Sequence, residues 1–236
     1  MSWSTTADYV PEHSHVAPKS WIVQGSRFEF VLPIPLTVYC MLAAPEPLTN
    51  RNLLLHSPKF DRLNLGCGHK HLSDAINLDL TPNTNPDVIH DLNQLPWPFP
   101  DNHFREVLAY DVLEHLDDFI PVMEEIHRIC RDKAIVRIAV PHFSGPEAYT
   151  DPTHRRYFGY LSFDYVTGEN ELEFYTRARF KKLSSSIIFF PSLLNKLVWR
   201  MANRYPAAYE RRWAWIFPAW YLSFELEVQK TVINDK

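Results

Sequence analysis

Two glycines and an aspartate are spaced as a nucleoside site requires. The segment RLNLGCGHKHLSDAINLDL (residues 62–80) places Gly66 and Gly68 after one apolar run and Asp79 near the end of the next. In an open α/β sheet, ligands bind beyond the carboxyl ends of the strands, where a glycine turn lets the backbone approach them. A carboxylate at the end of the second strand can accept hydrogen bonds from a ribose diol. The pattern therefore predicts a site for a ligand that contains a nucleoside.

The spacing argues against a pyrophosphate in this ligand. Dinucleotide sites use G-x-G-x-x-G, a full helix and an acidic residue about 20 residues later, because the pyrophosphate rests on the helix N-terminus. Here His71 stands at the third glycine position, and Asp79 follows Gly68 by only 11 residues. The G-K-[ST] ending of a P-loop is also absent from the sequence. We therefore expect a ligand with an adenosine but no phosphate.

Apolar runs indicate the elements that carry these residues. From residue 60 onward, the strand-length runs are RLNL, AINLDL, DVIHDL, EVLAYDVL and AIVRIAV. Runs that are apolar on both faces indicate parallel strands covered by helices. Between the last two runs, EHLDDFIPVMEEIHRICRDK has apolar residues at helical spacing, Asp117 or Asp118 as a cap, and Pro121 in its first turn. Strand, helix and strand in succession predict an α/β fold.

The remaining chain divides into a long N-terminal extension and the end of the domain. FKKLSSSIIFF and WYLSFELEVQK are expected to be further strands, and they flank an aromatic helical insertion at about residues 191–218. We expect a flexible tail at residues 1–20, an N-terminal arm or lid at residues 21–58, and one domain at residues 59–236.

Charge and cysteine usage disfavour several classes of partner. With 24 basic and 28 acidic residues, the net charge of -4 gives no chain-wide attraction to nucleic acid. Cys40, Cys67 and Cys130 are far apart, which disfavours a disulfide framework and a structural zinc site and favours a cytoplasmic protein. The most apolar early run, residues 28–44, is shorter than the ~20 residues of a spanning helix, so no transmembrane segment is expected.

Six segments, read in order, resemble the class I S-adenosylmethionine-dependent methyltransferases, and are most similar to the small type 11 group. They are LNLGCG, INLDL, HDLNQLPWPFPDNHF, YDVLEHL, EEIHRI and VRIAVP, and they span roughly residues 60–142. The resemblance implies a Rossmann-like fold with a mostly parallel sheet and an antiparallel final strand at FELEVQK. It also implies an enzyme that transfers methyl groups, with S-adenosylmethionine as cofactor.

The resemblance further implies a set of cofactor-binding residues at the strand ends: Asn64, Gly66, Cys67, Gly68, Asp79, Leu80, Asp91, Leu92 and Asp111. The glycine turn would line the methionine moiety and Asp79 would hold the ribose. Asp91 and Leu92 would meet the adenine, and Asp111 would border the sulfonium. Asn64 stands where many members carry Asp or Glu, so this chain loses a charge near the ligand's amino group, which bears on cofactor affinity.

Candidate catalytic residues follow the fourth and fifth predicted strands. His115, in LEHL, would lie beside the sulfonium and could accept a proton from a substrate hydroxyl, although a histidine that only caps or packs also explains it. The loop after the fifth strand adds three candidates: His142, Asp151 and His154. Asp151 with Pro152 could also simply begin a short helix. Arg155 and Tyr157 are candidates for substrate binding, because loops at that edge select substrate.

Together these residues predict methyl transfer to a small-molecule acceptor, at a hydroxyl of a natural product or sugar, with no metal. Two alternatives stay open. Asn64 supports a binding or scaffold protein that has lost catalysis, and His142, Asp151 and His154 could hold the iron of a metal-dependent oxygenase. The aromatic and basic insertion leaves open a peripheral membrane contact or a homodimer.

Overall fold

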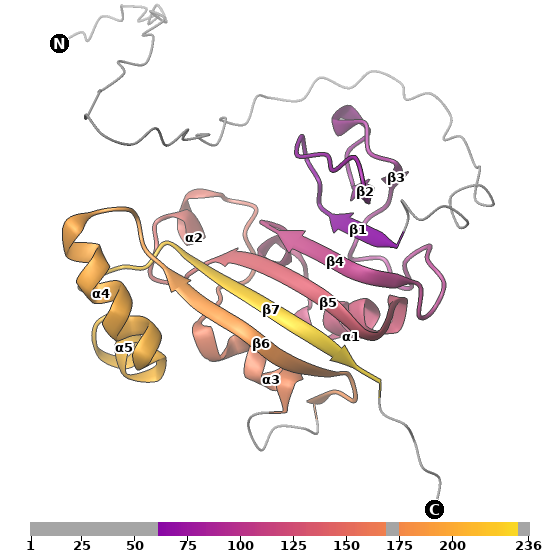
Figure 1. Cartoon of the computed structure of the whole chain (residues 1–236). Coiled ribbons are helices and arrows are strands. Elements are labelled where there is room, and N and C mark those ends of the chain that lie inside the picture. Colours follow the sequence, from indigo (N-terminus) through magenta and orange to yellow (C-terminus); the bar gives the residue numbers. More distant parts are fainter. Residues whose placement is uncertain (1–60, 169–174, 231–236) are drawn as a thin grey trace, which may run out of the picture. The chain divides into compact units, whose positions relative to one another are not determined.

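One seven-stranded sheet organises the part of the chain that the computed structural model describes, residues 61–168 and 175–230 (Figure 1). The strand order is β3-β2-β1-β4-β5-β7-β6. The strands are β1 (Arg62–Leu65), β2 (Ile76–Asp79), β3 (Val88–Ile89), β4 (Phe104–Tyr110), β5 (Cys130–Pro141), β6 (Arg179–Ile188) and β7 (Tyr221–Gln229). β1 to β5 run parallel, and β7 is antiparallel to β5 and β6. This confirms the expected α/β fold. The expected tail and arm lie outside the described residues.

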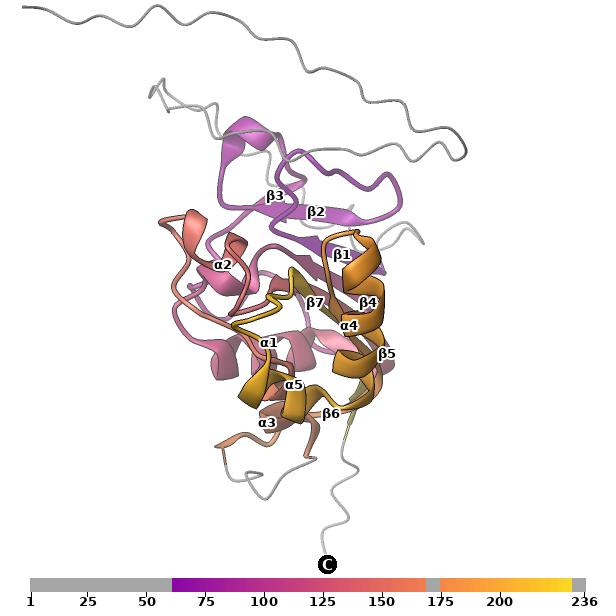
Figure 2. The same cartoon turned by 90° about the vertical axis from the view of Figure 1, so that its left-hand side faces the viewer.

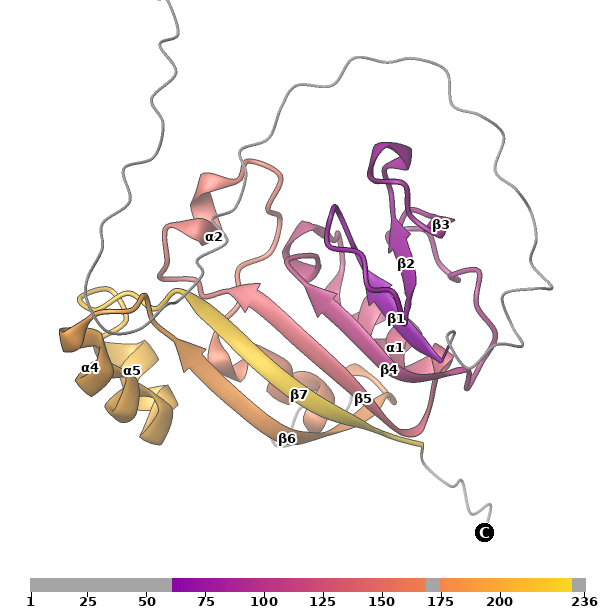
Figure 3. The ribbon, with the colours of Figure 1, turned by 45° about the horizontal axis from the view of Figure 1, so that its top comes forward.

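The strand order reverses beside β1. From β1 the chain adds β2 and β3 on one side, and then β4 and β5 on the other. Such a switch point leaves a crevice at the carboxyl ends of β1 and β4, where open α/β sheets bind ligands. In Figure 3 the arrowheads of β4 and β5 point toward this edge, next to the loop that carries α2. The glycine turn and the loops after β4 and β5 therefore meet at one edge of the sheet.

Helices connect the later strands. They are α1 (Phe119–Ile129), α2 (Glu147–Thr150), α3 (Asp164–Thr167), α4 (Leu193–Arg204) and α5 (Pro206–Arg212), with 3₁₀ turns at Pro82–Thr84, Leu113–His115 and Tyr160–Phe163. Asp118 is the N-cap residue of α1, and Pro121 lies in its first turn, where a missing N–H costs nothing. Between β1 and β2 the described chain forms only turns, because Asp79 follows Gly68 by only 11 positions and β2 already begins at Ile76, which leaves too little room for a packed helix.

Helices α1 and α3 pack against one face of the sheet, behind the strands in Figure 1. Side chains of β5 and β7 alternate between buried and half-exposed, with Val136, Ile138, Phe224 and Leu226 in the core beneath these helices. The expectation of a strand that is apolar on both faces is therefore wrong for β5, whereas β7 alternates as its sequence indicates. Their pattern has the period of two that is typical of a sheet with one core face.

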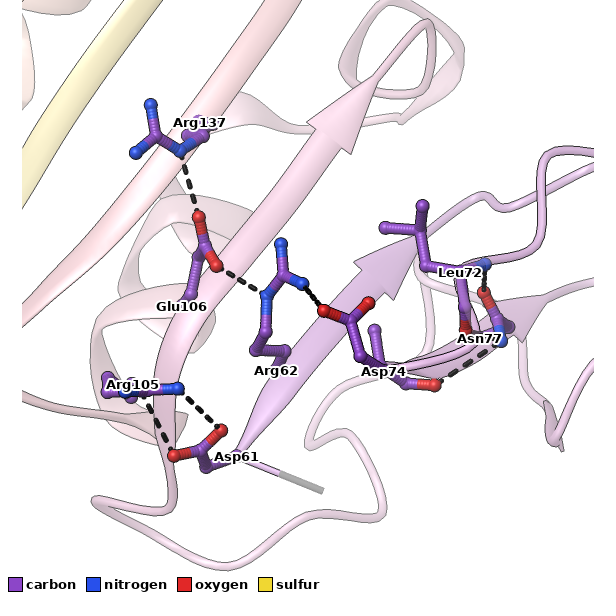
Figure 4. A network of polar contacts seen from close by, with 9 residues as sticks. Asp61, Arg62, Leu72, Asp74, Asn77, Arg105, Glu106 and Arg137 are labelled. Atoms are coloured by element: carbon purple, nitrogen blue, oxygen red, sulfur yellow. Dashed lines mark hydrogen bonds and ion pairs between the residues drawn. The ribbon is translucent and has the colours of Figure 1, made fainter. Parts of the chain in front are cut away.

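The opposite face carries a row of alternating charges (Figure 4). Arg62 on β1 lies between Asp74 and Glu106, and Glu106 on β4 also binds Arg137 on β5, with 2.8 Å between Glu106 Oε1 and Arg137 Nε. Arg137 continues the row to Glu225 on β7. Each of these ions has an oppositely charged neighbour, so this face is polar without leaving any of the five charges unpaired.

Helices α4 and α5 follow β6 and pack against each other (Figure 2). Large apolar side chains on this segment are exposed, including Leu197, Met201 and Tyr205 in successive turns. Lys196, Arg200 and Arg204 are exposed beside them. None of the helices in the described ranges has the length and apolar character needed to cross a bilayer. Contact with a membrane surface and dimer formation stay predictions.

Candidate functional site

The turn after β1 is shaped by two glycines in the left-handed region. Gly66 has φ +58° and Gly68 has φ +49°, a conformation that side chains with a Cβ adopt at a cost. A Cβ on Gly66 would lie 2.6 Å from Val112 Cγ2, so this glycine allows the turn to pack against the segment after β4. A Cβ on Gly68 would meet no atom within 4 Å. Gly68 therefore borders open space at the switch point, as a backbone that approaches a ligand should.

Asp79 links this turn to the end of β2. Its Oδ2 accepts a hydrogen bond from the backbone N–H of Gly68 at 2.8 Å, and its Oδ1 accepts one from Thr81 at 2.9 Å. The backbone N–H of Cys67 also donates to the carbonyl of Leu78 at 3.0 Å. A carboxylate has about four acceptor positions. Asp79 thus fixes the turn and keeps acceptor capacity for the two hydroxyls of a ribose.

The residues expected around an adenine follow β2 and β3. Leu80 is 63% exposed and presents an apolar side chain beside Asp79. The backbone N–H of His90 donates to the carbonyl of Asp79 at 3.0 Å, which brings the end of β3 next to β2. Asp91 Oδ1 accepts from the N–H of Asn93 at 2.9 Å, and the next residue, Leu92, is buried. Ribose and adenine contacts can therefore be made at neighbouring strand ends.

The structure explains why position 64 is an asparagine, which the sequence alone did not. Its side chain is buried, and its amide donates to the carbonyl of Lys70 at 2.9 Å and to Asn77 Oδ1 at 3.1 Å. The side chain of Asn77 in turn accepts a hydrogen bond from the backbone N–H of Leu72 and donates one to the carbonyl of Leu72. A carboxylate at position 64 could not donate to either partner. The amide therefore holds the loop between β1 and β2 in place.

Cys67 and Asp111 lie on the two sides of the switch point. Burial raises the pKa of the Cys67 thiol to about 11, with a further increase from the nearby charge of Asp79, so this thiol is a packing group and a poor nucleophile. Asp111 follows β4 with φ +54°, a strained conformation for a non-glycine residue. Lys70 Nζ lies 3.4 Å from its Oδ2. Strain of this kind at the end of a central strand is typical of a functional position.

The loop after β5 is fastened to the turn after β4. The backbone N–H groups of Arg155 and Arg156 donate to the carbonyl of Glu114 at 2.8 and 3.0 Å, and Arg155 also forms an ion pair with Asp117. These contacts bring His154 against His115, with 4.7 Å between the ring centroids and 72° between the planes. Two of the predicted catalytic residues, far apart in the sequence, are thus neighbours.

Hydrogen bonds fix which nitrogen of His115 is free. Thr153 Oγ1 lies 2.9 Å from His115 Nδ1 and donates its one proton to Asp151 Oδ1 at 2.7 Å. The hydroxyl must therefore accept from His115 Nδ1, which leaves the lone pair of the neutral ring on Nε2. Burial, with the neighbouring His154, lowers the pKa of His115, so the neutral ring is favoured. Burial opposes a lower pKa for Asp151, but the bonds from Thr153 outweigh it and hold that pKa below its usual value.

The expectation that Asp151 and Pro152 begin a short helix is wrong. Asp151 instead follows the end of α2, and its Oδ1 accepts from both the backbone N–H and the hydroxyl of Thr153. The side chain closes a local turn in place of a first helical turn, a common use of aspartate in loops. This turn positions Thr153 toward His115.

His142 does not join the other candidate catalytic residues. Its side chain is fully buried, with Nδ1 2.8 Å from Ser144 Oγ and Nε2 3.1 Å from Glu210 Oε1. Both nitrogens are therefore engaged in holding the loop after β5 to α5. In the described part of the chain, the side chains that come together as a ligand group are Glu114, His115 and His154. The oxygenase set drawn from His142, Asp151 and His154 is not formed there.

Glu114 is the site residue that the sequence reasoning missed. Its side chain is 1% exposed, and neither carboxylate oxygen has a hydrogen-bond partner among the described residues. Burial, with the charges of Asp111 and Asp151, raises the pKa of Glu114 to about 8. The position of Glu114 between Leu113 and the candidate His115 could have drawn attention to it. The sequence could not show, however, that this side chain is buried.

The candidate substrate-binding residues lie on the exposed side of the loop after β5. Arg155 is exposed beside Asp117, and Tyr157 is 52% exposed. The Tyr157 ring stacks on that of Tyr149, with 4.9 Å between centroids. A tyrosine pair at this edge offers an aromatic surface near the two histidines.

Comparisons with known proteins bear on the family of the central segment and on the fold. Residues 63–138 match the family model described as a methyltransferase domain. The fold is similar to a SAM dependent methyltransferase from Archaeoglobus fulgidus, at 15% identity and a TM-score of 0.50 over 70% of this chain and 85% of that chain. It is also similar to an S-adenosylmethionine dependent methyltransferase from Mesorhizobium loti, at 15% identity and a TM-score of 0.45 over 70% and 89%. A search of curated proteins returns no match.

The matched region contains the whole of the expected cofactor site, from the glycine turn to Asp111. Open space at Gly68 and the remaining acceptor capacity of Asp79 fit an adenosyl ligand. Residues 63–138 therefore match a methyltransferase domain, and the described sheet has the fold of S-adenosylmethionine-dependent methyltransferases, which supports S-adenosylmethionine as the cofactor.

Proposed function

We propose that the protein transfers a methyl group from S-adenosylmethionine to a hydroxyl of a small molecule, such as a natural product or a sugar. The observation that carries this proposal is the polar edge beside Asp111, where His115 and His154 meet. It lies past the end of β4, next to the position expected for the sulfonium. An acceptor hydroxyl placed there would face groups able to bind its oxygen or take its proton.

The residues at the strand ends are proposed to hold the cofactor. Asp79 accepts hydrogen bonds from the ribose, and Asp91 with Leu92 binds the adenine. The carboxylate of Asp111 favours a positive charge nearby. When bound, the cofactor supplies an activated methyl group on sulfur, so in-line placement of the acceptor can provide most of the rate, about 7 to 11 kcal/mol.

The proton of the acceptor hydroxyl must leave as the methyl group arrives. We place His115 at the acceptor oxygen, because its Nδ1 is held by Thr153 and its Nε2 remains available. The loop with Arg155 and Tyr157 covers the same edge and is proposed to select the substrate.

Asp79→Ala should abolish measurable binding of S-adenosylmethionine, because the ribose loses its acceptor and the carboxylate's hydrogen bonds from Gly68 and Thr81 are lost. His115→Ala should keep cofactor binding and slow methyl transfer. Calorimetry with the cofactor and a transfer assay over a panel of hydroxyl acceptors measure both effects. Asp132→Ala, at an exposed carboxylate near the start of β5 and so at the far end of that strand from the site, is the control. Undiminished binding by Asp79→Ala, or full activity of His115→Ala, would contradict the proposal.

The scaffold alternative loses its sequence support in the structure. Asn64 is explained by the two hydrogen bonds that its amide donates, and no loss of catalysis is needed to account for it. Calorimetry decides between the two functions, since a scaffold without cofactor would show no binding at millimolar S-adenosylmethionine.

A further inference from the structure

Glu114, His115 and His154 form a compact group of potential metal ligands. One ligand atom from each side chain lies within 4.8 Å of the other two. Glu114 and His115 come from the 3₁₀ turn after β4, and His154 comes from the loop after β5, which hydrogen bonds to the Glu114 carbonyl hold in place. The carboxylate is buried and both imidazoles are half-exposed. The group is therefore closed on the glutamate side and reachable from the histidine side.

The buried carboxylate of Glu114 points independently to a missing partner. At 1% exposure, neither of its oxygens has a hydrogen-bond partner among the described residues. A buried carboxyl group without a partner is costly, and native structures seldom keep one without a reason. Asp111 and Asp151 add negative charge close enough to act on it. A cation in this position would give the carboxylate a partner and offset the accumulated charge.

Both histidines are oriented as metal ligands usually are. A metal-bound imidazole typically donates its other N–H to a carbonyl, a carboxylate or a hydrogen-bonded group. His115 Nδ1 donates to Thr153, which is bound to Asp151, and His154 Nδ1 lies 3.1 Å from the carbonyl of Ala148. A carbonyl can only accept, so His154 Nδ1 carries the proton. Nε2 of each neutral ring is left with its lone pair.

We propose that Glu114, His115 and His154 bind a divalent transition-metal ion, for which Zn²⁺ is the best fit. Two imidazoles and one carboxylate are a ligand set of catalytic zinc sites, which keep one position open, whereas Mg²⁺ and Ca²⁺ prefer oxygen ligands. At Zn–N distances of ~2.0 to 2.1 Å, tetrahedral ligand atoms lie about 3.3 Å apart. The three side chains therefore need to close by no more than roughly 1.5 Å around the ion.

The role of this ion rests on the proposed function. A hydroxyl in the open position would lose its proton to solvent more readily, because the cation stabilises the oxygen's negative charge. That oxygen forms the bond to the methyl carbon while the carbon–sulfur bond breaks, which gives the methyl ether, S-adenosylhomocysteine and one released proton. His115 then acts as a ligand and not as a free base.

The test is Zn²⁺ binding by the full chain after removal of bound metal with a chelator. Calorimetric titration with Zn²⁺ should show one site per chain, weakened more than about 10-fold by Glu114→Gln and by His154→Ala. His127→Ala, at a histidine on α1 that contacts the Gln229 carbonyl, should bind Zn²⁺ like the wild type. Glu114→Gln keeps the size of the side chain, so circular dichroism should show the native fold.

Two further measurements separate this inference from the proposed function. Both site variants should bind S-adenosylmethionine like the wild type, and chelator-treated wild type should lose methyl transfer and regain it with Zn²⁺. The inference is overturned if the wild type binds no Zn²⁺, if the variants bind it equally well, or if the metal-free protein keeps full activity. In that last case methyl transfer itself stands, and His115 is restored as the base. Failure to bind S-adenosylmethionine would instead overturn the proposed function.

Discussion

Asp79 holds the glycine turn through Oδ2 and the segment after β2 through Oδ1, and its carboxylate still has acceptor capacity. The same residue therefore joins the stability of the turn to the proposed binding of the ribose. Gly66 and Gly68 have different roles, because Gly66 leaves room for the side chain of Val112 whereas Gly68 borders open space. The two glycines of the G-x-G pattern look equivalent in the sequence, but one allows close packing and the other leaves space for a ligand.

Alanine substitution should separate the two glycines. Gly66→Ala should destabilise the protein by roughly 2 to 5 kcal/mol, because backbone strain adds to the clash with Val112. Gly68→Ala should cost only about 1 to 2 kcal/mol from the backbone, yet weaken cofactor binding, since its methyl group enters the open space. Urea unfolding and calorimetry measure these effects. Equal destabilisation by the two variants would contradict the division of roles.

Thr153 should act by orienting His115. Thr153→Val removes the hydroxyl between His115 and Asp151, and should lower methyl transfer roughly 10- to 100-fold without changing cofactor binding. Thr153→Ser keeps the hydroxyl and should restore most of the rate, which a merely structural role for the methyl group would not explain. A steady-state assay of the two variants decides, and a Val variant as active as the Ser variant would remove Thr153 from the mechanism.

At the scale of elements, the row of charges across β1, β4, β5 and β7 explains how this sheet tolerates a face without a described helix. The row depends on Glu106, which binds Arg62 and Arg137. Burial opposes its ionisation, but the hydrogen bonds from Arg137 and Arg62 outweigh burial and lower the pKa of Glu106 below its ordinary value. The ionised carboxylate is therefore the form that stabilises the fold.

The stability of the domain should depend on pH through Glu106. Because its folded-state pKa is lowered, its contribution is complete above its ordinary pKa of 4.5 and is lost as pH falls through the lower folded value. Glu106→Gln should reduce the free energy of unfolding at pH 7 by roughly 1 to 2 kcal/mol, after allowance for solvent screening, and flatten the decline in acid. Urea unfolding between pH 3 and 7 measures it. An unchanged acid profile in the variant would show that other carboxylates control it.

The sequence predicted the positions of the strands better than the contacts that their side chains make. Apolar runs located β1, β2, β4 and β5, because a central strand needs several Val, Ile or Leu residues in succession. The polar face was missed because the charges at Arg62, Glu106 and Arg137 are in contact only after the strands pair. The contact between His115 and His154 and the burial of Glu114 were missed for the same reason. The two histidines are far apart in the sequence, with β5 and its loop between them, and they meet only in the folded chain.

At the scale of the whole molecule, cofactor binding links the loops at one edge of the sheet to the fold. S-adenosylhomocysteine at 100 times its dissociation constant should add about 2.7 kcal/mol to the stability of the native state. For a chain of this size, the melting temperature should rise by roughly 5 to 10 °C, while Asp79→Ala should show little rise. Thermal unfolding with and without the ligand measures this. Equal shifts for both proteins would mean that the ligand binds away from Asp79.

The central claim is that the turn after β1 and the carboxylate at the end of β2 together bind the adenosyl group. A crystal structure with S-adenosylhomocysteine tests it most directly. The claim predicts ribose hydroxyls within hydrogen-bond distance of Asp79 and the backbone of Gly68 against the ligand. A ligand bound elsewhere on the protein, or an Asp79 side chain turned away from the ribose, would contradict it.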